Sequence, residues 1–142
     1  MSNARTPAQM YALVFGALLL VIGVIGFFVD SAFESGSEIS GDELILFEVN
    51  GWHNIVHIAS GLVGLAMAGS AASARLFALG FGVVYGVVTL WGFIDDPILN
   101  LIPVNTADNF LHLAIAGAGI WAGLASSPRG PDAHEPRPST AA

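Results

Sequence analysis

The chain contains no cysteine and no lysine, and only 11% of its 142 residues are charged. The missing cysteines exclude disulfide bonds, thiolate metal sites and cysteine nucleophiles. All four basic residues are arginines, and a net charge of −7 argues against the basic surface that nucleic-acid binding requires. A soluble domain of this size carries about 25% charged residues. We therefore expect most of the chain to lie out of water.

Apolar residues make up 54% of the sequence, and the mean hydropathy is +0.71. They gather in four blocks, each near the 20 or so residues that cross a bilayer: 10–29, 51–70, 76–94 and 108–125. The sequence therefore predicts an all-α, polytopic membrane protein with four transmembrane helices. We expect residues 1–9 to form a cytoplasmic amino terminus and residues 10–125 the four-helix transmembrane domain. Residues 126–142, which include four prolines, should be a disordered cytoplasmic tail.

The arginines occur at the amino end, in the middle connector and in the tail: Arg5, Arg75, Arg129 and Arg137. The other two loops contain acids and no basic residue. Because positive residues of membrane proteins remain on the cytoplasmic side, this pattern predicts a multi-pass protein of the cell membrane with both termini cytoplasmic. The apolar stretch 44–47 in the first acidic loop is too short to span the bilayer. We expect it to be a turn of helix at the membrane surface or packed under the loop.

Two stretches repeat each other at an offset of 55 residues: NGWHNIVHIASGLVGLAMA (50–68) and NTADNFLHLAIAGAGIWAG (105–123). In both, polar and then small residues recur at a 4-3-4-3-4 spacing, which places them on one stripe of a helix. The stripes are Asn50, Asn54, His57, Gly61, Gly64, Ala68 and Asn105, Asn109, His112, Ala116, Gly119, Gly123. We interpret the chain as two repeated helical hairpins that meet along these stripes. The second and fourth helices would then face each other across an axis along the membrane normal.

The polar members of the stripes form the candidate site: Asn50, Asn54, His57, Asn105, Asn109 and His112. A polar group in hydrocarbon requires a partner, and asparagine and neutral histidine offer both donors and acceptors. The first interpretation is a hydrogen-bonded clasp between the two Asn–His pairs, with small residues below them allowing close helix approach. This clasp assigns the protein a structural or accessory role, as a homo-oligomer or as part of a larger membrane complex.

A second interpretation adds His53, four residues before His57, and Asp108, four residues before His112. The set His53, His57, Asp108 and His112 offers imidazole and carboxylate ligands to zinc or a similar divalent metal. Alternatively, His57 and His112 would be the axial ligands of one haem in a redox protein. A third interpretation is a small transporter or channel. The cytoplasmic halves of the stripes contain no charged residue that could line such a path, which argues against this interpretation. No nucleophile–base pair or phosphate-binding glycine motif is present, which argues against an enzyme.

Three runs resemble the bacterial domain of unknown function 4383 family: FEVNGWHNIVHIASGLVGL, RLFALGFGVVYGVVTLWGF and IPVNTADNFLHLAIAGAGI. The resemblance covers about residues 8–125, and the pattern VN-x3-N-x2-H occurs twice, at 49–57 and 104–112. It implies a small integral membrane protein with four helices and marks Asn54, His57, Asn109 and His112 as residues of the family pattern. It implies no activity.

Overall fold

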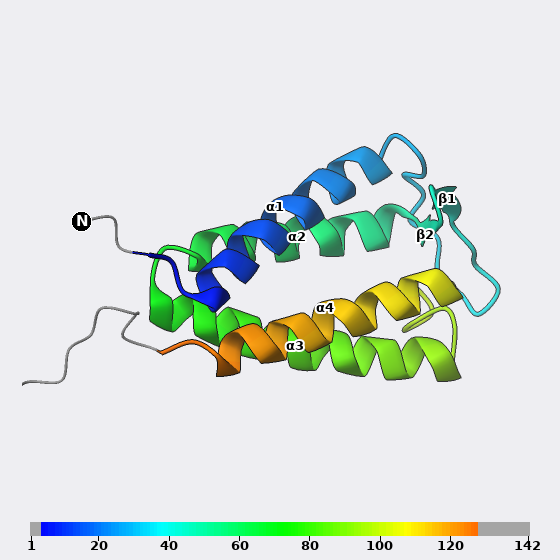
Figure 1. Cartoon of the computed structure of the whole chain (residues 1–142). Helices are drawn as coiled ribbons and strands as arrows, with labels where there is room; N and C mark the ends of the chain where they lie inside the picture. The colour runs from blue at the N-terminus through cyan, green and yellow to red at the C-terminus, as the bar shows by residue number, and fades with distance from the viewer. Residues whose placement is uncertain (1–3, 128–142) are drawn as a thin grey trace, which may run out of the picture.

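The computed structural model describes residues 4–127 (Figure 1). Its helices are α1 (Pro7–Gly26), α2 (Gly51–Met67), α3 (Ala71–Ile94) and α4 (Thr106–Leu124). Two short strands, β1 (Asp42–Leu44) and β2 (Phe47–Val49), lie between α1 and α2. The regular secondary structure of the described residues is therefore helical apart from one small hairpin, which confirms the predicted all-α class with four helices. Residues 128–142 of the predicted tail lie outside the described part of the chain.

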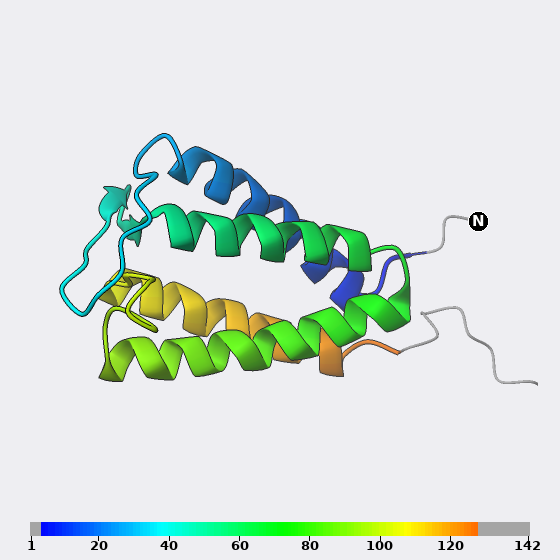
Figure 2. The same cartoon turned by 180° about the vertical axis from the view of Figure 1, so that it is seen from behind.

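The helices pair as two antiparallel hairpins, α1 with α2 and α3 with α4 (Figures 1 and 2). The hairpins approach each other at the end that carries the amino terminus and the α2–α3 turn. They diverge toward the end that carries β1 and β2, as both views show. The space between the hairpins at this second end is where polar side chains of α2 and α4 come together.

The small residues of the two stripes pack mainly against the backbone of the preceding helix in their own hairpin. A Cβ atom on Gly61 of α2 would lie 2.7 Å from the carbonyl oxygen of Gly16 in α1. A Cβ atom on Gly119 of α4 would lie 2.8 Å from the carbonyl oxygen of Ala78 in α3. The prediction that the second and fourth helices meet along these stripes is therefore wrong. Small residues let two backbones approach closely, and here the neighbouring backbone belongs to the preceding helix.

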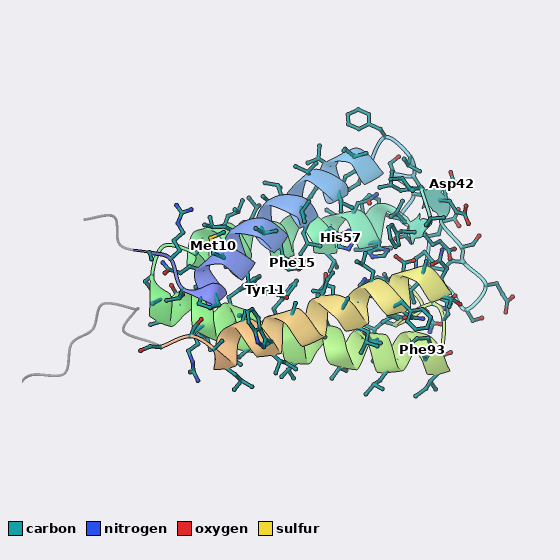
Figure 3. The ribbon with its side chains drawn as sticks, in the orientation of Figure 1. Met10, Tyr11, Phe15, Asp42, His57 and Phe93 are labelled. Carbon is teal, nitrogen blue, oxygen red and sulfur yellow. The ribbon has the colours of Figure 1, made fainter. Side chains whose placement is uncertain are left out.

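Two helices, α1 and α3, are long and apolar enough to cross a membrane. Their outer faces carry large apolar side chains that no other element covers, as Leu18, Val21, Val83 and Leu90 show. Side chains project outward from the helices over much of the surface (Figure 3). Leu90, for example, is 66% exposed, whereas the core helix of a soluble protein would bury such a residue. Length, composition and exposed apolar surface together indicate a membrane location.

The stretch 44–47 forms the turn of a β-hairpin, so the prediction of a helical turn there is wrong. Leu44 pairs with Phe47 and Glu43 with Glu48 in antiparallel register. Ile45 has a φ of 65°, a left-handed conformation that β-branched residues rarely adopt. Two-residue turns of this kind usually contain asparagine or glycine. Because neither residue is present in the turn, the local sequence carries no hairpin signal.

The two ends of the described chain are tied to each other. Thr6 and Gln9 form a capping box, so α1 begins at Pro7, three residues before the predicted block. Ser126 is buried; its Oγ accepts a hydrogen bond from the Ala8 N–H (2.8 Å) and donates one to the Ala122 carbonyl (2.7 Å). Ser126 therefore belongs to the folded domain, although the sequence placed it in the tail.

Candidate functional site

Asn50 and Asn105 begin α2 and α4, and both reach across to the other hairpin. Each side-chain oxygen accepts a hydrogen bond from the backbone N–H three residues later, as an N-cap does. Asn50 Nδ2 also donates to the Leu101 carbonyl (2.8 Å), and Asn105 Nδ2 donates to the Leu46 carbonyl (2.9 Å). These reciprocal bonds hold the acidic loops of the two hairpins together and set the positions of the first turns of α2 and α4.

Asn54 and Asn109 lie inside their own hairpins, away from the histidines. Asn54 Nδ2 donates to the Asp30 carbonyl (2.8 Å), and its Oδ1 lies against Gly26 of α1. Asn109 Oδ1 lies in the same way against Gly92 of α3. Neither side chain hydrogen-bonds to a histidine within residues 4–127. The predicted Asn–His clasp therefore does not form, and these two asparagines fit the interface of a helix with its hairpin partner.

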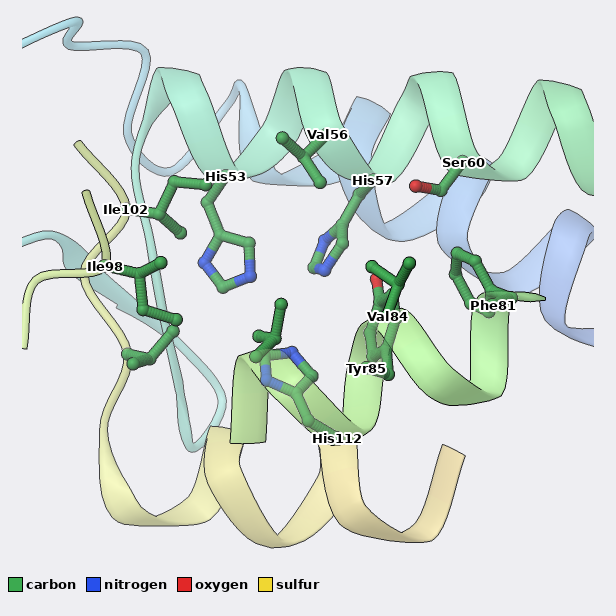
Figure 4. A pocket seen from close by; sticks show the side chains of 12 residues that line it. His53, Val56, His57, Ser60, Phe81, Val84, Tyr85, Ile98, Ile102 and His112 are labelled. Carbon is green, nitrogen blue, oxygen red and sulfur yellow. The ribbon is translucent and has the colours of Figure 1, made fainter. Parts of the chain in front are cut away.

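Three histidines meet in the space where the hairpins diverge (Figure 4). His53 and His57 come from α2 and His112 from α4, and one ligand nitrogen from each lies within 4.8 Å of the others. The ring centroids of His53 and His57 are 4.4 Å apart, and those of His53 and His112 are 6.0 Å apart. Their side chains are 2%, 8% and 3% exposed, respectively. Three of the four residues predicted as metal ligands are thus brought together by two different hairpins.

The polar contacts of the three rings differ. His53 Nδ1 lies 2.8 Å from the Glu48 carbonyl, so Nδ1 carries the proton and Nε2 carries a lone pair. His57 Nδ1 and His112 Nδ1 are buried without a hydrogen-bond partner among the described residues. Buried polar atoms in folded proteins nearly always have a partner. The two unpaired nitrogens therefore mark the cluster as a place for a further ligand.

Asp108 is the predicted ligand that does not join this group. Its Oδ2 accepts hydrogen bonds from the backbone N–H of Glu48 (2.9 Å) and of Asn105 (3.0 Å). The carboxylate thereby completes the cap of α4 and holds the end of β2 in place. Because the Glu48 carbonyl orients the His53 ring, Asp108 acts on the cluster as a positioning residue.

A cavity of about 170 Å³ lies beside the three rings, between α2 and α3 (Figure 4). Besides the histidines, its lining consists of Val56, Ser60, Phe81, Val84, Tyr85, Val88, Ile98, Ile102 and Val104. The Tyr85 ring stands edge-on to His112, with centroids 5.0 Å apart and an interplanar angle of 86°. Sequence reasoning missed Tyr85, because its place at the site depends on how α3 packs against α4. Its spacing of four residues from Phe81 was the available signal for a shared helix face.

A family model described as "Domain of unknown function (DUF4383)" matches residues 9–125. The chain belongs to this family. The match confirms the resemblance carried by the three sequence runs, and it includes all three clustered histidines. No curated protein and no solved structure gave a match to the chain. The function of this DUF4383 chain is therefore argued from its own geometry.

Proposed function

We propose that this DUF4383 chain is a four-span integral membrane protein that holds a divalent metal ion between its two hairpins. His53, His57 and His112 are the protein ligands. The observation that carries the proposal is the meeting of three buried imidazoles, with one nitrogen from each within 4.8 Å of the others.

The four spans are supported by the dimensions and surfaces of the shorter helices. With a rise of about 1.5 Å per residue, the 17 residues of α2 extend about 25 Å and the 19 residues of α4 about 28 Å. Both values are close to the roughly 30 Å hydrocarbon thickness of a bilayer. Ile55 and Leu62 on α2 and Leu113 and Trp121 on α4 are exposed apolar residues. Each shorter helix also runs beside α1 or α3, the two helices long enough to span alone.

The distribution of charges supports one orientation of the protein in the membrane, and two asparagine contacts support the repeated hairpins. Arg5 precedes α1 and Arg75 lies near the start of α3, at the end where the hairpins approach each other. The acidic loops lie at the opposite end, so the positive-inside rule puts both termini in the cytoplasm of a cell-membrane protein. The matched contacts of Asn54 with Gly26 and Asn109 with Gly92 support two repeated hairpins.

The absence of native cysteine makes this topology directly testable. Ser37 in the first acidic loop and Ala72 near the α2–α3 turn are both exposed. We expect a membrane-impermeant maleimide to label Ser37→Cys in intact cells and Ala72→Cys only after lysis. Labelling of Ala72→Cys in intact cells would contradict the proposed orientation.

The chemistry of the cluster favours a first-row divalent ion. Imidazole suits zinc, copper, iron and nickel. In a tetrahedral site with Zn–N bonds of about 2.0–2.1 Å, the ligand nitrogens are about 3.3 Å apart. The observed separations of up to 4.8 Å mean that the rings draw together by no more than about 1.5 Å when the ion binds. The Glu48 carbonyl fixes the tautomer of His53, as outer-shell acceptors do for metal-bound histidines.

The metal would join α2 directly to α4, at the end where the loops of the two hairpins are already hydrogen-bonded. Two ligands belong to the first hairpin and one to the second, so coordination connects α2 to α4. An ion that binds only the folded state stabilises it by about 2.7 kcal/mol at 100 times its dissociation constant. The haem alternative is less favoured, because it uses His57 and His112 alone, whereas His53 lies in the same cluster.

Metal analysis of the protein purified in mild detergent tests the proposal, with a purification tag that contains no histidine. We expect about one ion per chain in the wild type. Occupancy should fall sharply in His57→Gln and in His112→Gln. His134, the remaining histidine, lies outside the described residues, and His134→Gln is the matched control with unchanged occupancy. A folded wild-type protein that stays metal-free after incubation with zinc and with copper would refute the metal site and favour a structural, accessory role.

A further inference from the structure

An apolar groove runs between α2 and α3 from the histidines toward the α2–α3 turn. A second cavity, of about 430 Å³, shares Ser60, Phe81 and Val84 with the histidine cavity and continues to Met67. We call the two cavities together the α2–α3 groove. From Val56 to Met67 the backbone of α2 rises about 16 Å. Figure 2 shows the two helices diverging from their common turn.

The groove is polar at one end and apolar over the rest of its length. The three histidines and Tyr85 lie at the wide end. Beyond them, Ser60 is the one polar residue of the lining within residues 4–127. Val63 and Val84 at the mouth are 50% and 55% exposed, so the groove opens on the face that the bilayer would cover. This distribution matches an amphiphile with a small polar head and a long apolar chain.

The direction of the groove also matches an amphiphile of the outer leaflet. In the proposed topology the histidines lie toward the outer surface, and Met67 lies toward the cytoplasm. A lipid of the outer leaflet points its head outward and its chain inward. A single-chain amphiphile could therefore enter sideways from the bilayer without turning over.

The charge of the proposed metal site selects the head group. Three neutral imidazoles leave the two positive charges of the ion uncompensated, and a buried charge needs a partner. The carboxylate of Asp108 is engaged with two backbone N–H groups, and no acid lines the groove within the described residues. A site with three histidine ligands also leaves one coordination position open. A carboxylate supplies both the missing charge and an oxygen ligand.

We propose that the α2–α3 groove binds a long-chain carboxylate, with its head on the open metal position and its chain between α2 and α3. This inference rests on the proposed metal site. It gives that site a substrate class, namely a fatty acid drawn from the membrane.

The test uses the full-length protein in phosphatidylcholine nanodiscs, loaded with Co²⁺ in place of the native ion. The visible absorption of Co²⁺ reports changes in its ligands. We expect laurate to shift the spectrum and to saturate, whereas acetate lacks the chain and methyl laurate lacks the carboxylate. Neither should reproduce the shift at the same concentration.

A matched pair of variants on α2 locates the chain. Val63 lines the groove, and Leu62 lines neither of its two cavities; the two residues are 50% and 53% exposed. Val63→Trp should weaken laurate binding at least about tenfold, the equivalent of two displaced methylene groups. Leu62→Trp should leave the laurate affinity unchanged, and both variants should retain the cobalt spectrum.

The outcomes separate the two proposals. Absence of any cobalt absorption in folded protein overturns the metal site, and the groove ligand fails with it. A normal cobalt spectrum that laurate does not alter overturns the groove ligand alone. If methyl laurate and laurate shift the cobalt spectrum equally, the groove binds a lipid tail and the proposed carboxylate ligand is wrong. Disulfide-linked dimers of Val63→Cys in a protein unresponsive to laurate would assign it to a second copy of the chain.

Discussion

Replacing Gly119 by alanine should loosen the contact between the hairpins at the end where they approach each other. The added Cβ would lie 2.8 Å from the Ala78 carbonyl oxygen and 2.8 Å from the Tyr11 hydroxyl oxygen. The Tyr11 hydroxyl donates a buried hydrogen bond to the Ile115 carbonyl (3.0 Å). The methyl group therefore forces both a backbone shift between α3 and α4 and the displacement of a tyrosine that belongs to α1.

The size of the effect follows from three contributions. Overpacking a filled interface costs about 1–3 kcal/mol. Leaving the tyrosine hydroxyl buried without its acceptor costs about another 1–3 kcal/mol. Alanine favours the helix over glycine by about 1 kcal/mol. The net loss of stability should be about 1–5 kcal/mol, with a central value near 3 kcal/mol.

The matched control lies two residues earlier on the same helix. Gly117 is exposed, and a Cβ built on it meets nothing within 4 Å. Gly117→Ala should be neutral or stabilising by up to about 1 kcal/mol. Titration of the detergent-solubilised protein with dodecyl sulfate, followed by helical circular dichroism, compares the two midpoints. Equal unfolding midpoints for Gly119→Ala and Gly117→Ala would show that close packing of a neighbouring helix against the stripe residues does not contribute to stability.

Three further outcomes are expected. Ser126→Ala should lower stability by about 1–3 kcal/mol in the same titration, because the Ala8 N–H loses its buried acceptor; an unchanged midpoint would contradict the docked end of α4. Asn105→Ala should cost about 1–2 kcal/mol, since it removes both an N-cap and the bond to the Leu46 carbonyl. Metal occupancy of the histidine cluster should fall as the pH is lowered, because bound histidines must be neutral and protons compete with the ion. Metal analysis after dialysis at several pH values would detect this, and occupancy independent of pH would argue against histidine ligands.

The helices could be predicted because their signal is local. Apolar blocks of nearly spanning length, bounded by charged loops, define α1 and α3 without any tertiary information. The hairpin of β1 and β2 could not be predicted, since Ile45 occupies a turn position that normally requires asparagine or glycine. Its conformation is fixed by contacts made elsewhere, including the bond that Asn105 donates to the Leu46 carbonyl.

Which helix packs against each small-residue stripe could not be predicted from the sequence, for a different reason. The spacing of Gly61 and Gly64 identifies a face on which another backbone can approach, but any helix with a complementary face would satisfy it. In this structure α1, the helix that precedes α2 in the chain, presents that complementary face. The same holds for the asparagines: Asn54 fills the space beside Gly26 of α1, whereas the predicted clasp required it to hydrogen-bond to a histidine.

The asymmetry between His53 and Asp108 explains why three histidines meet and not two. The offset of 55 residues makes the two positions equivalent and makes Glu48 equivalent to Pro103. Asp108 is satisfied because the Glu48 backbone donates an N–H to its carboxylate. The backbone of Pro103 faces His53, but proline has no N–H to donate. A carboxylate at position 53 would therefore be buried without its second donor, at the cost of an uncompensated charge. Histidine avoids this cost by donating to the Glu48 carbonyl, and its second nitrogen is then the one available to the proposed metal ion.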